Sequence, residues 1–464
     1  MNEPEWKGAL GEAFEEALGY LEGLPSRPLS GYPGLAELRA ALAEPLSEQS
    51  LEPRQVVADL AAAAEPGVVG SGSGRFFGFV VGGAMPAALA ADWLASTWDQ
   101  NAGLYVLGPA ASVVEEVAGE WLAELLGLSA GVSVGFVTGA QMANFTGLAI
   151  ALQEMLRRAG WDLARNGLWA APEVRIFAGQ DRHGTIDRAL RFLGAGTDAI
   201  VEIAADDQGR MLPAALAAAL EQGSGPAIVC AQVGNVNSGA IDPVGEICEI
   251  AHRHEAWVHV DGAFGLWAAA SPRFRPLVAG IELADSWATD AHKWLNVPYD
   301  SGLAFCAHPD AHRAAMGSKA GYLMPAAGGE RDALDYNPEH SRRARGFAVY
   351  AALRALGRQG VAELVERCCE LANRFAEQLA AAAQVEVLNN VVLNQVLVRF
   401  LATDGDHDGY TRRVIERVQQ DGTCWMSGTT WQGRAAMRIS VSNWSTDEAD
   451  VDKSVAAILR CARQ

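Results

Sequence analysis

The stretch WVHVDGAF at residues 257–264, followed by ADSWATD at 284–290, decides the fold of this chain. Each segment is a short, mostly apolar run that carries an aspartate at or near its end, which is typical of a buried β-strand. GLAFCAH at 302–308 has the same character. We therefore predict three successive strands, the first two of which end at polar groups able to carry chemistry.

The same strand pattern recurs upstream, where it alternates with helical periodicity. Short apolar strands separated by helices predict an α/β fold with a mostly parallel sheet covered by helices on both faces. The further strand-like runs are GVSVGFVT (131–138), VRIFAG (174–179), AIVEIAAD (199–206) and AIVCAQVG (227–234). The helical patterns between them lie at 142–161, 185–194, 213–220 and 245–256.

Changes in composition divide the chain. Residues 1–70 carry helical patterns and form a predicted N-terminal helical arm, and the Gly/Ser-rich run at 67–79 marks the crossing into the next region. We predict a large domain over 71–318 and a small C-terminal α/β domain over 341–464. The polar segment 319–340 between them is long for an internal connection, and we predict a mobile active-site loop there.

Charge and hydropathy exclude several classes of protein. The 464 residues carry 36 Lys and Arg against 56 Asp and Glu, so we expect neither nucleic acid nor a membrane surface as a partner. The N-terminus is acidic where a signal peptide would be basic and then apolar, which predicts a cytoplasmic protein. Residues 125–153 carry no charge, but glycines interrupt them and their period changes. We predict a strand, a turn and a buried helix there rather than a membrane span.

Cysteine usage indicates a reducing environment. The chain has seven cysteines and no CxxC pair. They are too sparse for a disulfide scaffold or a Cys-rich metal site, so we predict reduced, mostly buried thiols and no bound metal.

Polar groups directly after apolar strands are candidate site residues, because ligands of an open parallel sheet bind at the carboxyl ends of its strands. Asp261 ends WVHVD, where it could accept a hydrogen bond from a protonated ring nitrogen or merely cap the next turn. Lys293 follows ADSWATD closely, and a lysine among apolar neighbours forms imines with aldehydes, although most lysines are surface residues. The small-residue turn at 138–141 would expose amide groups to a phosphate, but such turns are common.

Together the three features predict one ligand, a phosphorylated aldehyde with a basic ring nitrogen, which is pyridoxal 5′-phosphate (PLP). His183 follows the strand VRIFAG and is placed to stack on the ring, although an isolated histidine more often has no functional role. No GxGxxG motif opens a helix after a strand in this sequence, which argues against a nicotinamide-dependent oxidoreductase.

These motifs resemble the PLP-dependent group II amino-acid decarboxylases, the family of aromatic-L-amino-acid and glutamate decarboxylases. VHVDGAFG and DSWATDAHKWLN carry the resemblance, and GRFFGF, HGTIDRAL, GAIDPVGEI, SRRARGFAVYAALRALG and MRISVSNWSTDEAD extend it from about residue 30 to the end. The resemblance implies PLP-dependent fold type I, like that of aspartate aminotransferase, with a seven-stranded sheet. It also implies a homodimer with active sites at the subunit interface and the N-terminal arm wrapped around the partner.

The resemblance assigns roles to individual residues. Lys293 would carry PLP as the internal aldimine, and Asp261 would pair with the pyridinium nitrogen. His183 would stack on the ring, and Ala263 would pack on its other face. Tyr322 matches the loop tyrosine that delivers a proton after carbon dioxide leaves, so Lys293, Tyr322 and His183 are the predicted catalytic residues. The positions that match the phosphate site are Gly139, Ala140, Gln141 and His292.

Three departures from the family pattern bear on substrate identity. Gln141 takes a place that usually holds a hydroxyl residue, and residues 234–236 read Gly-Asn-Val where the family has Gly-Thr-Thr. Residues 80–82, Val-Val-Gly, replace polar residues after the RFF element. PLP binding stays the prediction because the lysine, the aspartate and the stacking histidine are all present.

The resemblance implies decarboxylation of an L-amino acid to the amine and carbon dioxide. The alternatives are aldehyde synthesis, transamination, carbon–carbon cleavage and a non-catalytic PLP-fold protein. Tyr322 favours the decarboxylase, because a phenylalanine at this position in the family accompanies aldehyde formation.

The thirteen tryptophans slightly favour an aromatic substrate, although core packing is the more common role of tryptophan. Arg342, Arg343 and Arg345 could hold a carboxylate or phosphate, or form inter-domain ion pairs.

Overall fold

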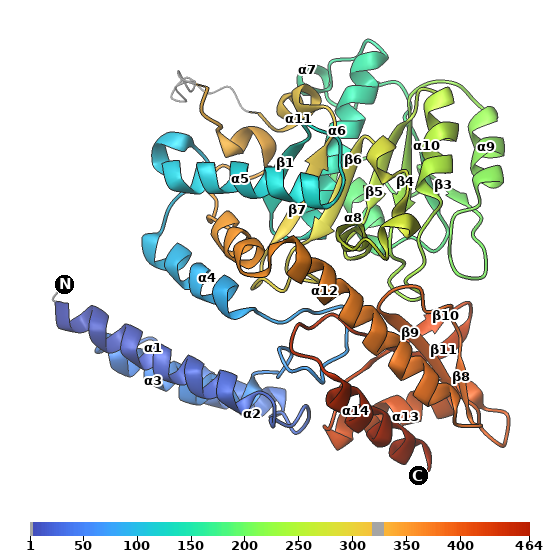
Figure 1. Ribbon diagram of the computed structural model, residues 1–464. Coiled ribbons are helices and arrows are strands. Elements are labelled where there is room, and N and C mark those ends of the chain that lie inside the picture. The colour runs from blue at the N-terminus through green and yellow to red at the C-terminus, as the bar shows by residue number, and fades with distance from the viewer. Residues whose placement is uncertain (1–2, 318–328) are drawn as a thin grey trace.

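The computed structural model describes residues 3–317 and 329–464 of the chain. Figure 1 shows an N-terminal group of helices that projects from one side, a large sheet wrapped by helices, and a smaller sheet near the C-terminus. The predicted arm, large domain and small domain correspond in order to these three regions, and their boundaries near residues 70, 318 and 341 stay a prediction.

The large sheet has seven strands and is mostly parallel. Strand β5 (Trp257–Asp261) lies in the middle. Within this sheet only β7 runs antiparallel to its neighbours, so the predicted α/β class and seven-stranded sheet are confirmed. On one side of β5 lie β4 (Ala227–Gln232), β2 (Arg175–Gly179) and β3 (Ile200–Ile203), and on the other lie β6 (Ser286–Asp290), β7 (Gly302–Cys306) and β1 (Ser133–Val137).

Helices cover both faces of this sheet, which explains why its central strands are apolar along their whole length. Successive residues of β4 alternate between two separate cores, with Val229 in one and Ile228 and Cys230 in the other. Every residue of β4, β5, β6 and β7 is buried. The helices of this region are α5 (Pro109–Leu125), α6 (Ala140–Arg158), α7 (Leu163–Asn166), α8 (Gly184–Phe192), α9 (Pro213–Glu221), α10 (Val244–Arg253) and α11 (Pro309–Met316).

The uncharged segment 125–153 forms the end of α5, strand β1 and most of α6, as predicted. Across the described ranges, no helix is both long enough and apolar enough to cross a membrane. All seven cysteines are free and buried, which confirms the prediction of reduced, buried thiols.

A four-stranded antiparallel sheet follows near the C-terminus. Helices α13 (His407–Asp421) and α14 (Glu448–Ala462) accompany it. The pattern of SGTTW does not predict strand β10, because this strand is poor in apolar residues and pairs with β11 alone. The strand order is β10 (Ser427–Trp431), β11 (Arg434–Ser440), β9 (Gln395–Phe400) and β8 (Val385–Val387).

The N-terminal region is built of helices, in agreement with the sequence pattern. Helix α1 (Glu3–Gly23) packs along α3 (Pro53–Ala64), and α2 (Leu35–Leu42) lies beside α3. Helix α4 (Pro86–Trp98) leads from here toward the large sheet. Short 3₁₀ helices lie at Glu65–Gly67, Tyr105–Leu107, Gly265–Ala270, Arg275–Val278, Ile281–Leu283 and Ala333–Tyr336.

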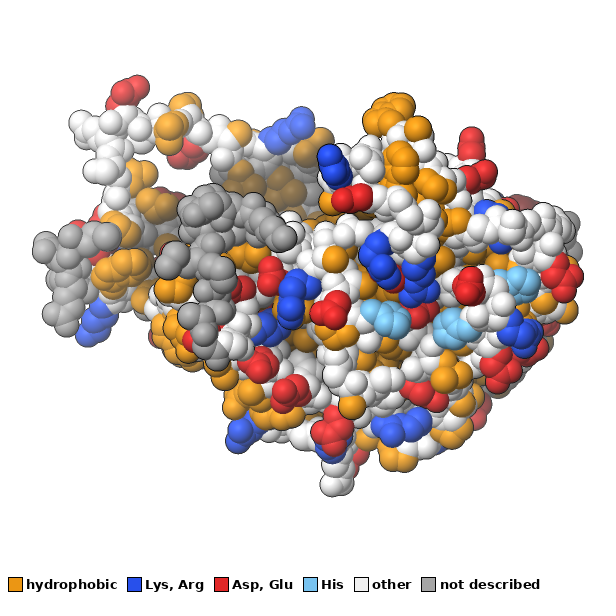
Figure 2. Space-filling view, turned by 90° about the horizontal axis from the view of Figure 1, so that it is seen from above, with side chains coloured by type: hydrophobic (Ala, Val, Ile, Leu, Met, Phe, Trp, Pro, Cys, Tyr) orange, Lys and Arg blue, Asp and Glu red, His pale blue; other side chains and the backbone are white. Residues whose placement is uncertain are grey.

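Charges of both signs are mixed on the surface. On the face shown in Figure 2, Lys and Arg side chains are interspersed with Asp and Glu side chains, and hydrophobic side chains lie between them. A face that binds a polyanion would instead gather Lys and Arg. The expectation, drawn from the net charge of −20, that nucleic acid is not a partner stays a prediction.

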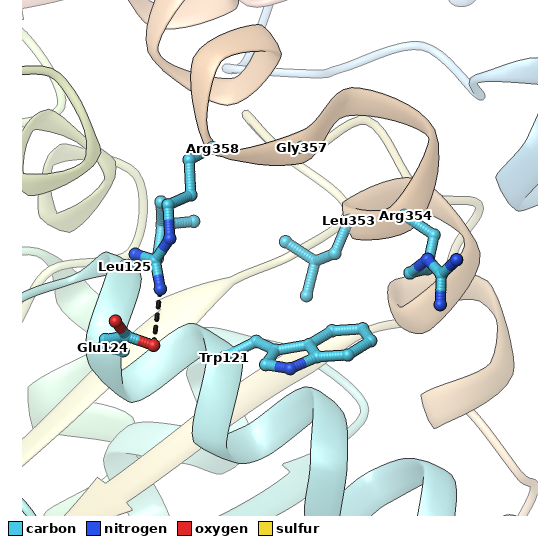
Figure 3. Close-up of a pocket in the computed structure, with 7 residues that line it drawn as sticks. All are labelled: Trp121, Glu124, Leu125, Leu353, Arg354, Gly357 and Arg358. Carbon is cyan, nitrogen blue, oxygen red and sulfur yellow. Dashed lines mark ion pairs between the residues drawn. The ribbon is translucent and has the colours of Figure 1, made fainter.

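One long helix, α12 (Gly346–Ala380), runs from the large sheet to the small one (Figure 1). Its backbone breaks at Gly357, where φ is 61° and ψ is 179°, a combination nearly confined to glycine. Figure 3 shows this break facing α5 across a cavity of about 330 Å³. Trp121 forms part of the cavity wall, and Arg358, just beyond the break, pairs with Glu124.

The break in α12 predicts that alanine is not tolerated at its centre. Gly357→Ala should lower the free energy of unfolding by about 1–3 kcal/mol, because the new Cβ meets open space but the backbone conformation is strained for any L side chain. Chemical denaturation measures this loss. The control is Gly19→Ala in α1, where nothing lies within 4 Å and the φ is ordinary, so a gain of about 0.5–1 kcal/mol is expected. Equal effects of the two substitutions would contradict the prediction.

Candidate functional site

The carboxyl ends of β5 and β6 and the turn after β1 open into one cavity of about 350 Å³. Asp261 ends β5, and Lys293 lies three residues after the end of β6. Tyr322 lies outside the described residues. The other predicted site residues all line this cavity: Gly139, Ala140, Gln141, His183, Asp261, Ala263, His292 and Lys293.

Lys293 is held by an acidic partner that the sequence reasoning missed. Its Nζ lies 2.8 Å from Oδ2 of Asp290, and the side chain is only about one fifth exposed, so it is not a surface lysine. Asp290 is buried, and its Oδ1 accepts a hydrogen bond of 2.5 Å from the backbone N–H of Ala140. The sequence feature that could have identified Asp290 is its position as the last residue of β6, directly before the AHK motif.

His292 is neutral and carries its proton on Nε2. Its Nδ1 accepts a 3.1 Å hydrogen bond from the backbone N–H of Ser301, so this nitrogen has no proton. Nε2 faces Oδ1 of Asp290 at 3.3 Å. Burial lowers the pKa of His292, an effect that Asp290 opposes and Lys293 reinforces. The ring also packs on Tyr299 with 4.3 Å between centroids.

Asp261 caps the turn after β5, as one of its two interpretations predicted, and its role toward a ring nitrogen stays a prediction. Its Oδ1 accepts a hydrogen bond of 3.2 Å from the N–H of Ala263 and so caps the local turn. Its Oδ2 accepts one of 3.4 Å from the hydroxyl of Thr185, which comes from another element, and the side chain lines the cavity. The carboxylate is almost fully buried, so it depends on these donors for its hydrogen bonds.

His183 stands at the start of α8 and faces the open cavity. Its Nδ1 accepts a hydrogen bond of 3.3 Å from the backbone N–H of Thr185, and its own backbone N–H donates to Oε1 of Gln232 at 3.1 Å. Desolvation by the surrounding protein lowers the pKa of His183, an effect that Asp261 opposes and Lys293 reinforces. The ring is therefore neutral near pH 7, with its proton on Nε2.

The departures at 80–82 and 234–236 have structural reasons. A Cβ at Gly82 would lie 2.0 Å from the carbonyl oxygen of Lys293, so glycine is needed where this segment crosses the lysine. Asn235 uses its amide to hold its own loop, accepting from the N–H groups of Asn237 and Ser238. Val236 lines the cavity and offers it an apolar surface instead of a hydroxyl.

The open question about the three arginines is answered in favour of ion pairs. Arg342 is buried and pairs with Glu115 at 2.8 Å, far from solvent. Arg343 and Arg345 pair with Asp92 and Asp300, each at 2.7 Å.

Tryptophan does not line this cavity among the described residues. Trp425 stacks on Phe79 at 5.3 Å between centroids, and Phe79 does line it. Phe264 lines it as well. Two phenylalanines, one of them backed by a tryptophan, thus give the cavity aromatic surface. Other tryptophans, such as Trp257 and Trp287, are buried in the core, whereas Trp98 and Trp169 are exposed.

The close approach between Gly82 and the carbonyl oxygen of Lys293 predicts that a side chain at position 82 disturbs the cavity. Gly82→Ala should displace the Lys293 backbone, lower the free energy of unfolding by about 1–3 kcal/mol and weaken binding at the cavity. Thermal unfolding and a ligand titration measure the two effects. Gly11→Ala, whose Cβ would meet nothing within 4 Å, is the control: like Gly19→Ala, it should raise the free energy of unfolding by about 0.5–1 kcal/mol, and it should leave ligand binding unchanged. Unaltered binding in the Gly82 variant would show that the segment moves freely.

Comparisons with known proteins agree on one family. The model of the pyridoxal-dependent decarboxylase conserved domain matches residues 36–401. Tryptophan decarboxylase 1 of Oryza sativa subsp. japonica is 29% identical over 428 residues, which cover 85% of this chain and 81% of that protein. L-2,4-diaminobutyrate decarboxylase of Rhizobium meliloti (strain 1021) is 30% identical over 386 residues, 81% of this chain and 75% of that protein. The crystal structure of Oryza sativa TDC with PLP and tryptamine superposes with a TM-score of 0.93 at 25% identity, over 100% of this chain and 98% of that one.

Proposed function

The chain belongs to the pyridoxal-dependent decarboxylase family, and from this premise we propose that it removes carbon dioxide from an L-amino acid and releases the amine. Its cofactor is PLP, and it is a carboxy-lyase by family. One observation carries the proposal: Asp261 ends β5, Lys293 follows the adjacent parallel strand β6 by three residues, and the two side chains line the same cavity.

The residues that line the cavity fit PLP. A volume of about 350 Å³ suits a ligand of this size, and the walls offer an amine, a buried carboxylate and the N-terminal end of α6, whose helix dipole favours an anion. When bound, PLP supplies an aldehyde that takes up an amine and a ring that withdraws electrons. We propose that Lys293 binds the aldehyde, Asp261 the ring nitrogen, and His183 and Ala263 the two ring faces. The phosphate would lie at Gly139, Ala140, Gln141 and His292.

Asp290 positions Lys293 for this role, because its Oδ2 lies 2.8 Å from Nζ and holds the amine at the cavity wall. The lysine would lose its proton when its amine binds the aldehyde. Asp261 would hold a proton on the ring nitrogen, which keeps the ring electron-poor while the bond to the carboxylate breaks. Tyr322 and His183 are the proposed proton donors to the substrate carbon, and Tyr322 lies outside the described residues.

An aromatic substrate is slightly favoured. Phe79 and Phe264 line the cavity, and Val236 adds an apolar surface where a hydroxyl was expected. Similarity to both a tryptophan and a diaminobutyrate decarboxylase leaves the side chain of the substrate to experiment. Aldehyde synthesis, transamination or carbon–carbon cleavage on the same scaffold is the alternative, and the tyrosine at position 322 favours decarboxylation over the first of these.

We expect Lys293→Ala to abolish covalent attachment of PLP, because no other lysine lines the cavity among the described residues. Asp261→Ala should retain the attached cofactor but lower turnover by about 10²–10³-fold, since the ring nitrogen loses its charged partner. Visible absorbance and mass spectrometry after borohydride reduction measure attachment. Normal turnover in the Asp261 variant would contradict its assignment.

A panel of L-amino acids incubated with the PLP-loaded wild-type protein tests the reaction itself. Carbon dioxide, amine and hydrogen peroxide should be measured together. Equal yields of carbon dioxide and amine without peroxide are expected for a decarboxylase. Peroxide with an aldehyde product, or no carbon dioxide from any substrate, would overturn the proposal in favour of an alternative.

We also propose a cytoplasmic homodimer, with the N-terminal arm as part of the interface. Helix α1 packs along α3, yet it leaves Trp6, Leu10 and Leu21 exposed, and α3 leaves Leu60 exposed. Exposed apolar side chains gathered on one projecting element are typical of a protein–protein contact. The seven free thiols fit a reducing compartment.

Charge placed on the arm should weaken the dimer. Leu10→Glu combined with Leu60→Glu should raise the dimer dissociation constant by about 10-fold or more, because each buried leucine contributes about 1.5–3 kcal/mol. Light scattering across a dilution series measures this constant. Leu212→Glu, an exposed leucine at the start of α9, is the control and should leave it unchanged. A monomeric wild type would refute the dimer outright.

A further inference from the structure

A buried chain of hydrogen bonds runs behind the cavity from the strands to its wall. Nε1 of Trp257 donates to Oγ of Ser286 at 2.9 Å, and Oγ of Ser286 lies 2.9 Å from Nδ1 of His259. Nε2 of His259 lies 2.9 Å from Oδ1 of Asn144, and Nδ2 of Asn144 donates to Oγ1 of Thr185 at 3.1 Å. Except for Thr185, these side chains are fully buried, so water cannot replace any of these bonds.

The hydrogens in this series of hydrogen bonds can point in only one direction. An indole N–H can only donate, and the amide of Asn144 donates to Thr185, so Oδ1 of Asn144 must accept from Nε2–H of His259. Complete burial lowers the pKa of His259 to about 3, so the ring is neutral and its Nδ1 must accept from the hydroxyl of Ser286. Every hydrogen therefore points the same way, from Trp257 toward Thr185.

Thr185 is the end of this chain and part of the cavity wall. Its oxygen already accepts from Asn144, so its own hydrogen must point toward the site. Two acceptors lie there, Oδ2 of Asp261 at 3.4 Å and Nδ1 of His183 at 2.9 Å. Nδ1 has a single lone pair and also accepts from the backbone N–H of Thr185, whereas a carboxylate accepts several bonds and binds them more strongly.

We propose that Thr185 is a positioning residue that holds Asp261 and His183 together in the arrangement that binds PLP. Its hydroxyl hydrogen, directed by the buried series of hydrogen bonds, is donated to Oδ2 of Asp261, and its backbone N–H is donated to Nδ1 of His183. The inference rests on the proposed function, because both residues it positions are assigned to the cofactor there. These two hydrogen bonds from one residue explain how Asp261, at the end of β5, and His183, which follows β2, keep one spacing.

Binding of PLP to the full chain tests the proposal without any substrate. Thr185→Val keeps the shape but loses the hydroxyl, and it should weaken PLP binding about 10-fold in an absorbance titration. Thr185→Ser keeps the hydroxyl and should stay within 3-fold of the wild type. The matched control is Thr146→Val, a fully buried threonine on α6 whose hydroxyl donates to Met142 O, and it should also stay within 3-fold.

A double-mutant cycle asks whether Thr185 acts through Asp261. In an Asp261→Asn background, Thr185→Val should cost less than 3-fold in PLP affinity, because the carboxylate that the hydroxyl serves is gone. A role in packing alone would give the same 10-fold loss in both backgrounds and would overturn the proposal.

Substitutions at Asn144 test the direction of the chain. Asn144→Asp supplies an acceptor, so the Thr185 hydroxyl would turn back and PLP affinity should fall about 10-fold with Thr185 intact. Asn144→Ala supplies no acceptor, so the hydrogen keeps pointing forward and affinity should stay within 3-fold, despite lower stability. Equal effects of the two changes would show that the hydrogen bonds do not set the direction of the Thr185 hydroxyl, and would overturn that part of the proposal.

Absence of PLP binding by the wild type would instead refute the proposed function. Wild-type binding of PLP with an unaffected Thr185→Val variant would refute this inference alone.

Discussion

The parallel pairing of β5 with β6 is the constraint on which the site depends. Asp261 lies opposite Ala288 in this pair, so β5 ends at the level of the middle of β6, and the chain after Asp290 returns toward the same edge. A shift of one residue in this register would turn the carboxylate to the other face of the sheet. Complete burial of both strands prevents such a shift, because it would exchange the side chains of two separate cores.

Buried polar groups then fix the positions of the side chains at the carboxyl ends of β5 and β6. Asp290 meets the amine of Lys293, the amide of Ala140 and the imidazole of His292, so one carboxylate joins the segment after β6 to the start of α6. Buried charges of this kind are tolerated only when they are paired and hydrogen-bonded. The same principle applies behind the cavity, where an unbroken series of donors leads to Thr185. Both networks hold polar atoms in place before any ligand arrives, which reduces the entropy lost on binding.

The surrounding regions complete this arrangement. Helix α12 joins the large and small sheets, and its break at Gly357 divides it into two segments. It packs against α4 and α5 beside the large sheet and against β8 and β9 of the small sheet. Phe79, which follows the N-terminal helices in the chain, reaches the cavity with Trp425 of the C-terminal region stacked behind it. The cavity is therefore lined by segments that lie more than 200 residues apart in the chain, from Phe79 to Lys293, and Trp425 supports it from behind.

The sequence by itself determined the α/β class, the strands of the large sheet, the family, and eight residues of the cavity wall. Such features follow from local patterns: apolar strands that alternate with helices, and polar residues at strand ends, such as Asp261 and Lys293. Only the tertiary structure decided the partners of Asp290, the need for glycine at position 82 and the hydrogen-bond chain to Thr185. These three features depend on which distant segments of the chain come together. The local spacing of apolar and polar residues does not encode contacts such as that between Asn144 and His259. Strand β10 escaped prediction for the same reason, because its pairing with β11 rather than its own composition makes it a strand.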